Sequence, residues 1–488
     1  MIMNMIIAIL LPIVFGAALP FLKIKNRKLK LGIITAVLAA EAALCLSVIL
    51  QEETPLLIWH ITDILSVSLK NDALSKLFIA IFAVGWLLVA IFSYVYMKHE
   101  EKEDRFYAFY LLSEGALIGL SLSANMVTMY VCFELVTLFS MPLVLHSMKK
   151  EAIHAALKYL FYSIAGAFMA LLGIFFLAAY SNNLDFVPGG CLDASLISGH
   201  ESLLLAVIFV AVIGFGTKAG MYPMHGWLPT AHPVAPAPAS AVLSALIAKA
   251  GVLAIIRILY YVVGTEFVAG TWVQTVLLIL SLLTVFMGSM MAYREKVFKK
   301  RLAYSTVSQI SYILTALFIF TPEGFTGALL HVVFHAAVKT CLFLTAGAII
   351  YYTGKTKVDE FAGMGKRMPV IMWCFTLASL TLIGIPPTGG FVSKWYIASA
   401  ALDSGLTAFN WLIPVILLIS ALLTAGYLLP ITISSFFPKK DEALLTLKRE
   451  ESPLMWVPLV ILAGICVILG MFSGGLTGFV SQIASVVA

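Results

Sequence analysis

The segment 214–251 constrains the fold most, because it joins two apolar runs through a stretch that no straight membrane helix can contain. The apolar run 203–231 is too long to cross a hydrocarbon core of about 30 Å as one helix. Glycines, then Pro223, predict that this helix is interrupted near the middle of the membrane, where non-helical backbone requires protein or water around it. The motif of the break comprises Pro223, His225, Pro229 and His232.

The rest of the chain indicates an all-α polytopic membrane protein with about fourteen transmembrane helices. It is 61% hydrophobic and only 11% charged, which excludes a water-soluble globular protein. Basic residues concentrate in alternate loops, at 23–30, 98–105, 149–150, 294–301, 355–367 and 439–449, while the opposite loops contain only Lys70. By the positive-inside rule both termini lie outside, which requires an even number of spans. We expect a multi-pass protein of a prokaryotic plasma membrane, with residues 1–22 retained as its first helix.

The sequence predicts no cofactor and no metal in this chain. Its six cysteines are scattered without a C-x-x-C pair, which argues against iron–sulfur or zinc ligation. It has no G-x-x-x-x-G-K-[ST] loop, so ATP does not drive it directly. The basic residues lie in short loops between apolar runs, so they do not indicate nucleic-acid binding.

Four lysines lie deep within apolar spans: Lys218, Lys249, Lys339 and Lys394. Facing lipid, they would together cost on the order of 10–14 kcal/mol on membrane-insertion scales. They must therefore face one another, acidic partners or water. Arg257 is ambiguous, since its side chain could also extend to the interface.

A second interrupted helix is predicted at 381–394, where Pro386 and Pro387 precede Lys394. It is the twelfth predicted span and the first break is in the seventh, so the two broken helices start from opposite sides. This arrangement is typical of two inverted five-helix repeats, spans 4–8 and 9–13, with a conduction path at mid-membrane. The expected divisions are 1–105 (three helices), 106–262 (first repeat), 263–436 (second repeat) and 437–488 (a loop and the last helix).

Two acidic residues within the apolar spans, Glu114 and Glu134, flank the polar turn 123–126. An antiparallel hairpin that turns there would place both carboxylates at similar depth. Either could instead be a single polar residue hydrogen-bonded within the bundle. Glu41 is a weaker candidate, because its surroundings show no helix break.

His331, His335 and Lys339 recur at four-residue spacing and share one face of the eleventh span over about 12 Å. A lysine in the row argues against a metal site. Removal from water disfavours the charged form of a lysine, whereas a nearby carboxylate favours it. A buried lysine can therefore take up or release a proton when its acidic partner moves closer or further away. Histidine exchanges protons near neutral pH without such help. The row therefore indicates proton transfer.

Several motifs together resemble the antiporter-like subunits of respiratory complex I, Mrp-type cation/proton antiporters and membrane-bound hydrogenases. These motifs are PMHGWLPTAH at 223–232, APAP at 235–238, FEL around Glu134, YSTVSQISY at 304–312, the row from His331 to Lys339, and GIPPTGGFVSK ending at Lys394. The resemblance covers nearly the whole chain. It implies fourteen helices, inverted repeats and a hydrated chain of charges at mid-membrane.

The resemblance also implies individual roles. Glu134 would pair with Lys218, Lys249 would relay protons near the row 331–339, and Lys394 would open the far half-channel. Glu114 is similar to a glutamate that only part of the family has. Some complex I members have glutamate where this chain has Lys394. The chain shows no long lateral helix after its last span, unlike one complex I subunit.

The leading interpretation is an ion-translocating subunit of a redox-driven complex, either complex I-like or a membrane-bound hydrogenase, with no redox centre of its own. Protons are the expected ion and sodium is the alternative. Its expected partners are homologous antiporter-like subunits, small membrane subunits and peripheral redox subunits. The alternative is a subunit of a secondary sodium/proton antiporter. A third possibility, an independent solute symporter with broken helices, is disfavoured by the motif at 223–232.

Overall fold

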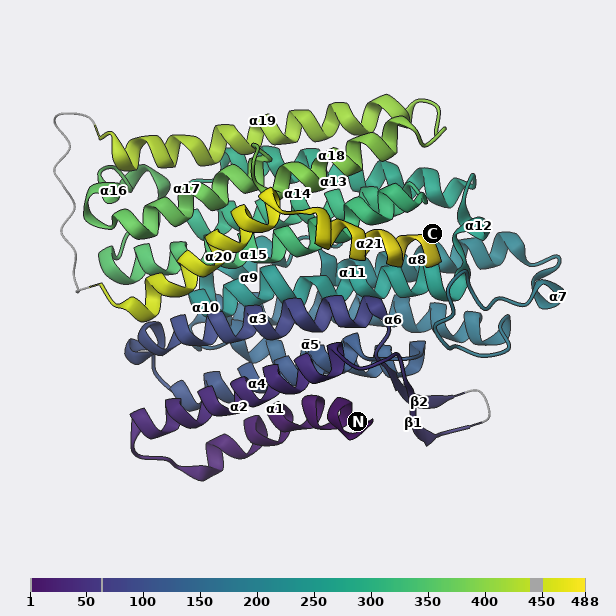
Figure 1. Ribbon diagram of the computed structural model, residues 1–488, viewed down its shortest axis with the longest axis horizontal. Helices are drawn as coiled ribbons and strands as arrows, with labels where there is room; N and C mark the ends of the chain where they lie inside the picture. The colour runs from purple at the N-terminus through teal and green to yellow at the C-terminus, as the bar shows by residue number, and fades with distance from the viewer. Residues whose placement is uncertain (1, 63–64, 439–450, 488) are drawn as a thin grey trace.

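The structure is a computed structural model that describes residues 2–62, 65–438 and 451–487, and helices dominate it (Figure 1). Eleven helices among the described residues are long and apolar enough to cross a membrane. In Figure 1 the long helices lie roughly side by side, from the N-terminal helices along one edge to α19 along the other. A helical, polytopic membrane protein is therefore confirmed.

The N-terminal part contains five long helices and a hairpin. The helices are α1 (Ile2–Leu22), α2 (Arg27–Ile49), α3 (Ala73–Tyr96, extended by the short η1, Met97–His99), α4 (Glu103–Ser121) and α5 (Met126–Val144). Strands β1 (Pro55–His60) and β2 (Ser66–Lys70) pair antiparallel between α2 and α3, with Leu56 opposite Leu69. This hairpin departs from the all-α prediction. The predicted turn between α4 and α5 is confirmed, and Asn125 caps α5 by accepting from the Thr128 amide at 2.9 Å.

The central part contains the first interrupted helix. Its elements are α6 (Lys150–Ala179), α7 (Ala194–Ile197), α8 (Glu201–Ala219), α9 (Leu228–Val234), α10 (Ala237–Val242), the π-helical η2 (Leu243–Ile247), α11 (Ala248–Ile256), the π-helical η3 (Arg257–Val263) and α12 (Thr265–Val268). Helix α8 packs closely on α6 at paired glycines, since a Cβ on Gly166 would lie 2.6 Å from the carbonyl oxygen of Gly214.

The next part contains the second interrupted helix. Its elements are α13 (Trp272–Arg294), α14 (Phe298–Phe318), α15 (Pro322–Thr353), η4 (Val358–Glu360), α16 (Met364–Arg367), α17 (Pro369–Ile383), α18 (Gly389–Leu402) and α19 (Phe409–Phe436). Both predicted breaks are confirmed: α8 ends at Ala219 and α17 at Ile383, each before a left-handed glycine, Gly220 and Gly384.

The C-terminal part differs from the prediction of a single last helix. Helix α20 (Pro453–Met471) is followed by α21 (Gly474–Val487), which packs against α15. The predicted basic loop at 439–449 lies outside the described residues, apart from its flanks.

Three predicted spans are not among the eleven apolar helices. They correspond to α4, α14 and the pair α17–α18. Helices α4 and α14 have 19 and 21 residues but carry more polar side chains, and α17 has only 15 residues. The count of fourteen therefore stays a prediction.

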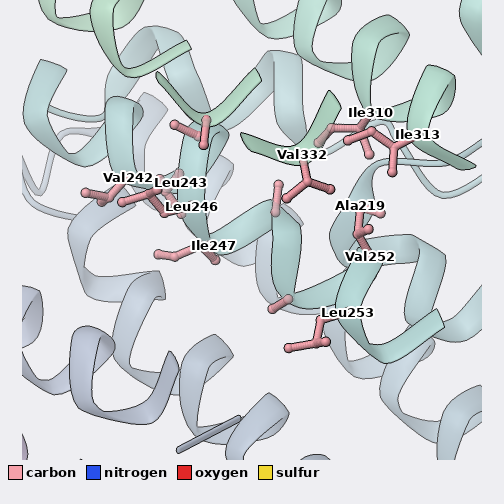
Figure 2. Close-up of a cluster of buried hydrophobic side chains, with 14 of the residues drawn as sticks. Ala219, Val242, Leu243, Leu246, Ile247, Val252, Leu253, Ile310, Ile313 and Val332 are labelled. Atoms are coloured by element: carbon pink, nitrogen blue, oxygen red, sulfur yellow. The ribbon is translucent and has the colours of Figure 1, made fainter. Parts of the chain in front are cut away.

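The buried core is centred on residues 237–263, whose side chains are buried on every face of the helix. Figure 2 shows Leu246, Ile247 and Leu253 of this span, with Ile310 of α14 and Val332 of α15, among the buried hydrophobic side chains. A helix that is apolar on all sides and enclosed by other helices has no lipid-facing surface. Lys249, in the middle of this span, is consequently held inside protein.

Candidate ion-translocation site

The first helix break lies just after Lys218, at the C-terminal carbonyl groups of α8. Gly220 has φ +77°, and a Cβ there would lie 2.2 Å from Leu228 Cδ1, so only glycine fits. The indole of Trp227 turns back and donates to the Thr217 carbonyl at 2.9 Å, which satisfies one terminal carbonyl of α8. A side chain of the break thus provides a hydrogen bond to the backbone that the break interrupts. Lys218 lies in the last turn of α8.

Lys218 is buried, with 1% of its surface exposed, and it reaches α5. Its Nζ donates to the Phe133 carbonyl at 3.1 Å and to Thr137 Oγ1 at 2.5 Å, and it lies 4.3 Å from the centre of the Phe133 ring. Glu134 interacts with Lys218 electrostatically, but no ion pair within 4 Å joins them among the described residues. Glu134 Oε1 is buried and has no hydrogen-bond partner in the described part of the chain. The expected pair is thus close but not in direct contact.

Lys249 contacts the histidine row directly. Its Nζ lies 2.6 Å from His335 Nδ1 and donates to the Ser244 carbonyl at 3.3 Å. Ser244 belongs to η2, where π-helical winding alters the regular pattern of carbonyl pairing, and such segments are frequent at functional sites. The structure therefore brings together two titratable groups that lie far apart in the sequence.

His331 connects the row to the second break. Its Nδ1 lies 2.9 Å from Ser393 Oγ on α18, and its ring stacks on Tyr312 of α14 at 5.6 Å and on His335 at 6.0 Å. Lys394, the neighbour of Ser393, lies 4.9 Å from the centre of the same Tyr312 ring. The row thus contacts Lys249 through His335, and His331 and Lys394 share the Tyr312 ring.

The side chain of Lys394, a residue of α18, reaches the C-terminal end of α17. Its Nζ donates to the carbonyls of Leu382 at 2.6 Å and Ile383 at 3.0 Å. These carbonyls have no helical partner because Gly384 ends α17, and the negative end of the helix dipole favours a cation there. The break at Pro386 and Pro387 therefore creates the binding place for the ammonium group.

Lys339 faces a different neighbour. Its Nζ donates to the Leu302 carbonyl at 3.1 Å and to Ser305 Oγ at 2.7 Å, and Tyr427 of α19 donates to the same Ser305 oxygen at 2.8 Å. Sequence reasoning did not identify Ser305, Tyr427, Ser393 or Thr137, because isolated hydroxyl residues in apolar helices carry no pattern.

The two histidines of the first break have separate environments. His232 is completely buried, both ring nitrogens lack a hydrogen-bond partner, and its ring lies 4.8 Å from that of Phe343. Lys299 and Lys339 act on it electrostatically. His225 stacks on Tyr222 at 5.8 Å, near Lys158. Pro229 is the second residue of α9, in the first turn, where helices tolerate proline.

A cavity of about 410 Å³ opens beside the junction of α9 and α10, on the side of the basic loops. Its lining includes Glu100, Lys149, Pro236 and Lys299. Lys299 Nζ donates to the carbonyl of Ala235 at 2.6 Å, at the point where the helix is interrupted. The cavity is also lined by Pro233, the chain neighbour of His232.

Glu114 is placed differently from Glu134. It is 1% exposed and interacts with Glu41 of α2, whereas Glu134 faces Lys218. The helical hairpin of α4 and α5 therefore directs Glu114 and Glu134 towards different helices. Glu41 is fully buried. The signal that could have identified Glu41 is the high cost of a single carboxylate in an otherwise apolar span.

Arg257 does not extend to an interface. Its guanidinium forms a buried ion pair with Asp72, with Nη1 2.6 Å from Oδ2 and Nη2 2.9 Å from Oδ1. Among the described residues, no group of three or more His, Cys, Asp or Glu side chains is arranged to hold a metal ion.

Fold and site together define a polytopic membrane protein with a chain of buried lysines, histidines and acids between two broken helices. A family model described as "NADH:quinone oxidoreductase/Mrp antiporter, TM" matches residues 123–424, and the chain belongs to this family. It is 32% identical to NADH-quinone oxidoreductase subunit N of Desulforudis audaxviator, over 86% of this chain and 84% of that protein.

The chain is also similar to an antiporter subunit and to a chain of a respiratory membrane complex. The chain is 30% identical to Na(+)/H(+) antiporter subunit A1 of Staphylococcus haemolyticus, over 96% of its own length but only 61% of that protein's. Its fold is similar to a chain in the membrane-bound sulfane sulfur reductase, an archaeal respiratory membrane complex, with TM-score 0.86, 23% identity, and coverage of 99% and 97%. Antiporter-like membrane subunits of large assemblies share this architecture.

Proposed function

We propose that this chain translocates protons across a prokaryotic plasma membrane as one subunit of a larger redox-driven complex. The path would run through Glu134, Lys218, Lys249, His335, His331 and Lys394, with Lys339 and Glu114 as side branches. The observation that carries the proposal is the 2.6 Å contact between Lys249 Nζ and His335 Nδ1 inside a fully buried span. At that distance a proton can pass directly between the two nitrogens.

The same geometry supports a path from one side of the membrane to the other. The cavity at the junction of α9 and α10 supplies access from the basic-loop side. The carbonyls of Leu382 and Ile383 hold Lys394 at the opposite break. Gaps remain between Glu134, Lys218 and Lys249, and bridging water would fill them.

The proposal includes fourteen membrane crossings, with both termini outside and inverted repeats at 106–262 and 263–436. Residues 1–105 would form an N-terminal group of three helices and 437–488 the C-terminal part. The two breaks lie in the seventh and twelfth proposed spans, an odd number of spans apart, which supports opposite orientations of the two broken helices.

The redox-driven assembly is the leading proposal because the quinone oxidoreductase subunit is the more similar of these two relatives, at 32% identity against 30% for the antiporter subunit. The alternative is a secondary sodium/proton antiporter. In either case the chain would carry no cofactor of its own and would bind further membrane subunits. Copurification distinguishes the two: flavin, iron–sulfur or nickel subunits support the first, and small membrane subunits alone support the second.

Lys218 provides the decisive test. Lys218→Met keeps the length of the side chain and removes its charge, so it should abolish ion translocation without harming insertion into the membrane. Lys218→Arg should also fail, because a guanidinium keeps its proton at physiological pH. The measurement is ΔpH formation in vesicles that contain equal amounts of assembled complex. If Arg restores translocation and Met prevents assembly, Lys218 is a structural charge and the relay is wrong.

A further inference from the structure

A second row of polar side chains lies between α2, α3 and α4, apart from the chain of lysines. At the basic-loop end, Arg27 Nη2 of α2 lies 2.6 Å from Glu103 Oε1 of α4. Lys30 Nζ lies 3.2 Å from Glu103 Oε2 and is also paired with Asp104. This charged cluster connects with the loop surface, since 46% of the Asp104 side chain is exposed.

Hydroxyl groups continue the row inward. Thr35 Oγ1 lies 2.8 Å from the Tyr94 hydroxyl, and the Tyr94 ring lies 6.0 Å from the ring of Tyr107. The Tyr107 hydroxyl lies 3.0 Å from Ser93 Oγ. Tyr107 also interacts electrostatically with Glu103 at the outer end, and Tyr94 with Glu114 at the inner end. We name this set, Thr35, Ser93, Tyr94 and Tyr107, the tyrosine column.

The column ends at two buried carboxyl groups, Glu41 of α2 and Glu114 of α4, which are 0% and 1% exposed. Their side chains interact with each other. The Cys45 thiol donates to Glu41 Oε1 at 2.8 Å, but Glu41 Oε2 and both oxygens of Glu114 have no donor among the residues that the structure describes. The nearby Tyr110 hydroxyl donates elsewhere, to the Trp86 carbonyl at 2.5 Å.

Two ionised carboxylates that face each other in a low-dielectric interior are not a stable arrangement. Burial of a charge without a partner costs several kcal/mol, and the cations of α2, Arg27 and Lys30, are about three to four turns away from Glu41. A single proton bound by the two carboxyl groups removes one of their two negative charges. It also provides an O–H group that can form a hydrogen bond between Glu41 and Glu114. The other titratable groups that face the pair are Cys45, Tyr94 and Tyr110.

We propose that Glu41 and Glu114 form a site for one exchangeable proton, reached from the basic-loop side through the tyrosine column. The inference rests on the proposed function in assuming that protons move through this chain. It concerns helices that precede the family match at 123–424, and the only residue it takes from the path proposed above is the side branch Glu114. The site stores a proton beside the main path.

Infrared spectroscopy of the assembled complex tests the site. Wild-type protein should show the C=O stretch of a buried protonated carboxyl group, and Glu41→Gln and Glu114→Gln should each alter or remove it. Transfer to D2O should shift this band rapidly if the column connects it to solvent. Tyr94→Phe should slow that exchange by about tenfold or more without reducing the band. Tyr96→Phe is the matched control, because Tyr96 lies on the same helix but interacts with Ala237.

The outcomes separate this site from the main relay. A band that neither glutamine variant changes would overturn the proton site, and equal exchange rates in Tyr94→Phe and Tyr96→Phe would overturn the column. Both glutamine variants should also lower the rate of ΔpH formation, and undiminished rates would refute a role in transport. Normal ΔpH formation in Lys218→Met would instead refute the proposed function and leave the infrared result standing.

Discussion

The ion pair between Asp72 and Arg257 fastens the start of α3 to the π-helical end of the central buried span. Arg257 is 1% exposed and Asp72 7% exposed, and the guanidinium also lies 4.5 Å from the centre of the Tyr261 ring. Asp72 is also the N-cap of α3, where its carboxylate accepts a hydrogen bond from the Ser75 amide at 2.8 Å. Substitutions can separate these two contributions.

Asp72→Asn keeps an oxygen for the Ser75 amide and removes the negative charge, so Arg257 becomes a buried cation without the anionic partner that Asp72 provides. Breaking a buried pair in this way lowers the free energy of unfolding by about 3–5 kcal/mol. Arg257→Met should be similarly costly, because it leaves the carboxylate of Asp72 uncompensated. The double variant contains neither charge and retains the helix cap, so it should lie within about 1 kcal/mol of the parent.

The assay is the free energy of unfolding of the purified protein in detergent micelles, from denaturant titration. The matched control is Asp359→Asn, which removes one partner of an exposed pair with Lys296 at 3.7 Å and should be indistinguishable from the parent. The reasoning fails if Asp72→Asn is no more destabilising than Asp359→Asn. It also fails if the double variant loses as much stability as the two single variants together.

Two other variants examine the second half of the molecule. Lys339→Ala should reduce ΔpH formation by about tenfold or less, because His335 contacts Lys249 without it, and complete loss would make Lys339 an obligatory relay. Gly390→Ala should prevent assembly, since a Cβ there would lie 1.7 Å from the Thr381 carbonyl oxygen and would force α18 away from α17. Gly464→Ala, with no atom within 4 Å of the added carbon, is its control; equal yields of monodisperse protein from both variants would contradict the close approach.

The sequence alone determined the class of fold and the identity of the unusual residues. Lys218 and Lys394 are conspicuous because a charge in an apolar span is costly in any tertiary arrangement. The two breaks are equally local, because glycine and proline at 220–223 and 384–387 end a helix whatever packs around it. The four-residue spacing from His331 to Lys339 also sufficed to place three titratable groups along one helix face.

Only the tertiary structure decided which group each of these residues contacts. The central span 237–263 is apolar on every face, so no amphipathic pattern indicates the direction in which Lys249 points. Its contact with His335, the separation of Glu114 from Glu134, and the burial of Glu41 depend on how neighbouring helices are rotated against one another. That rotation results from packing between segments far apart in the chain, such as Gly166 against Gly214. The residue pattern within a single helix therefore cannot predict it.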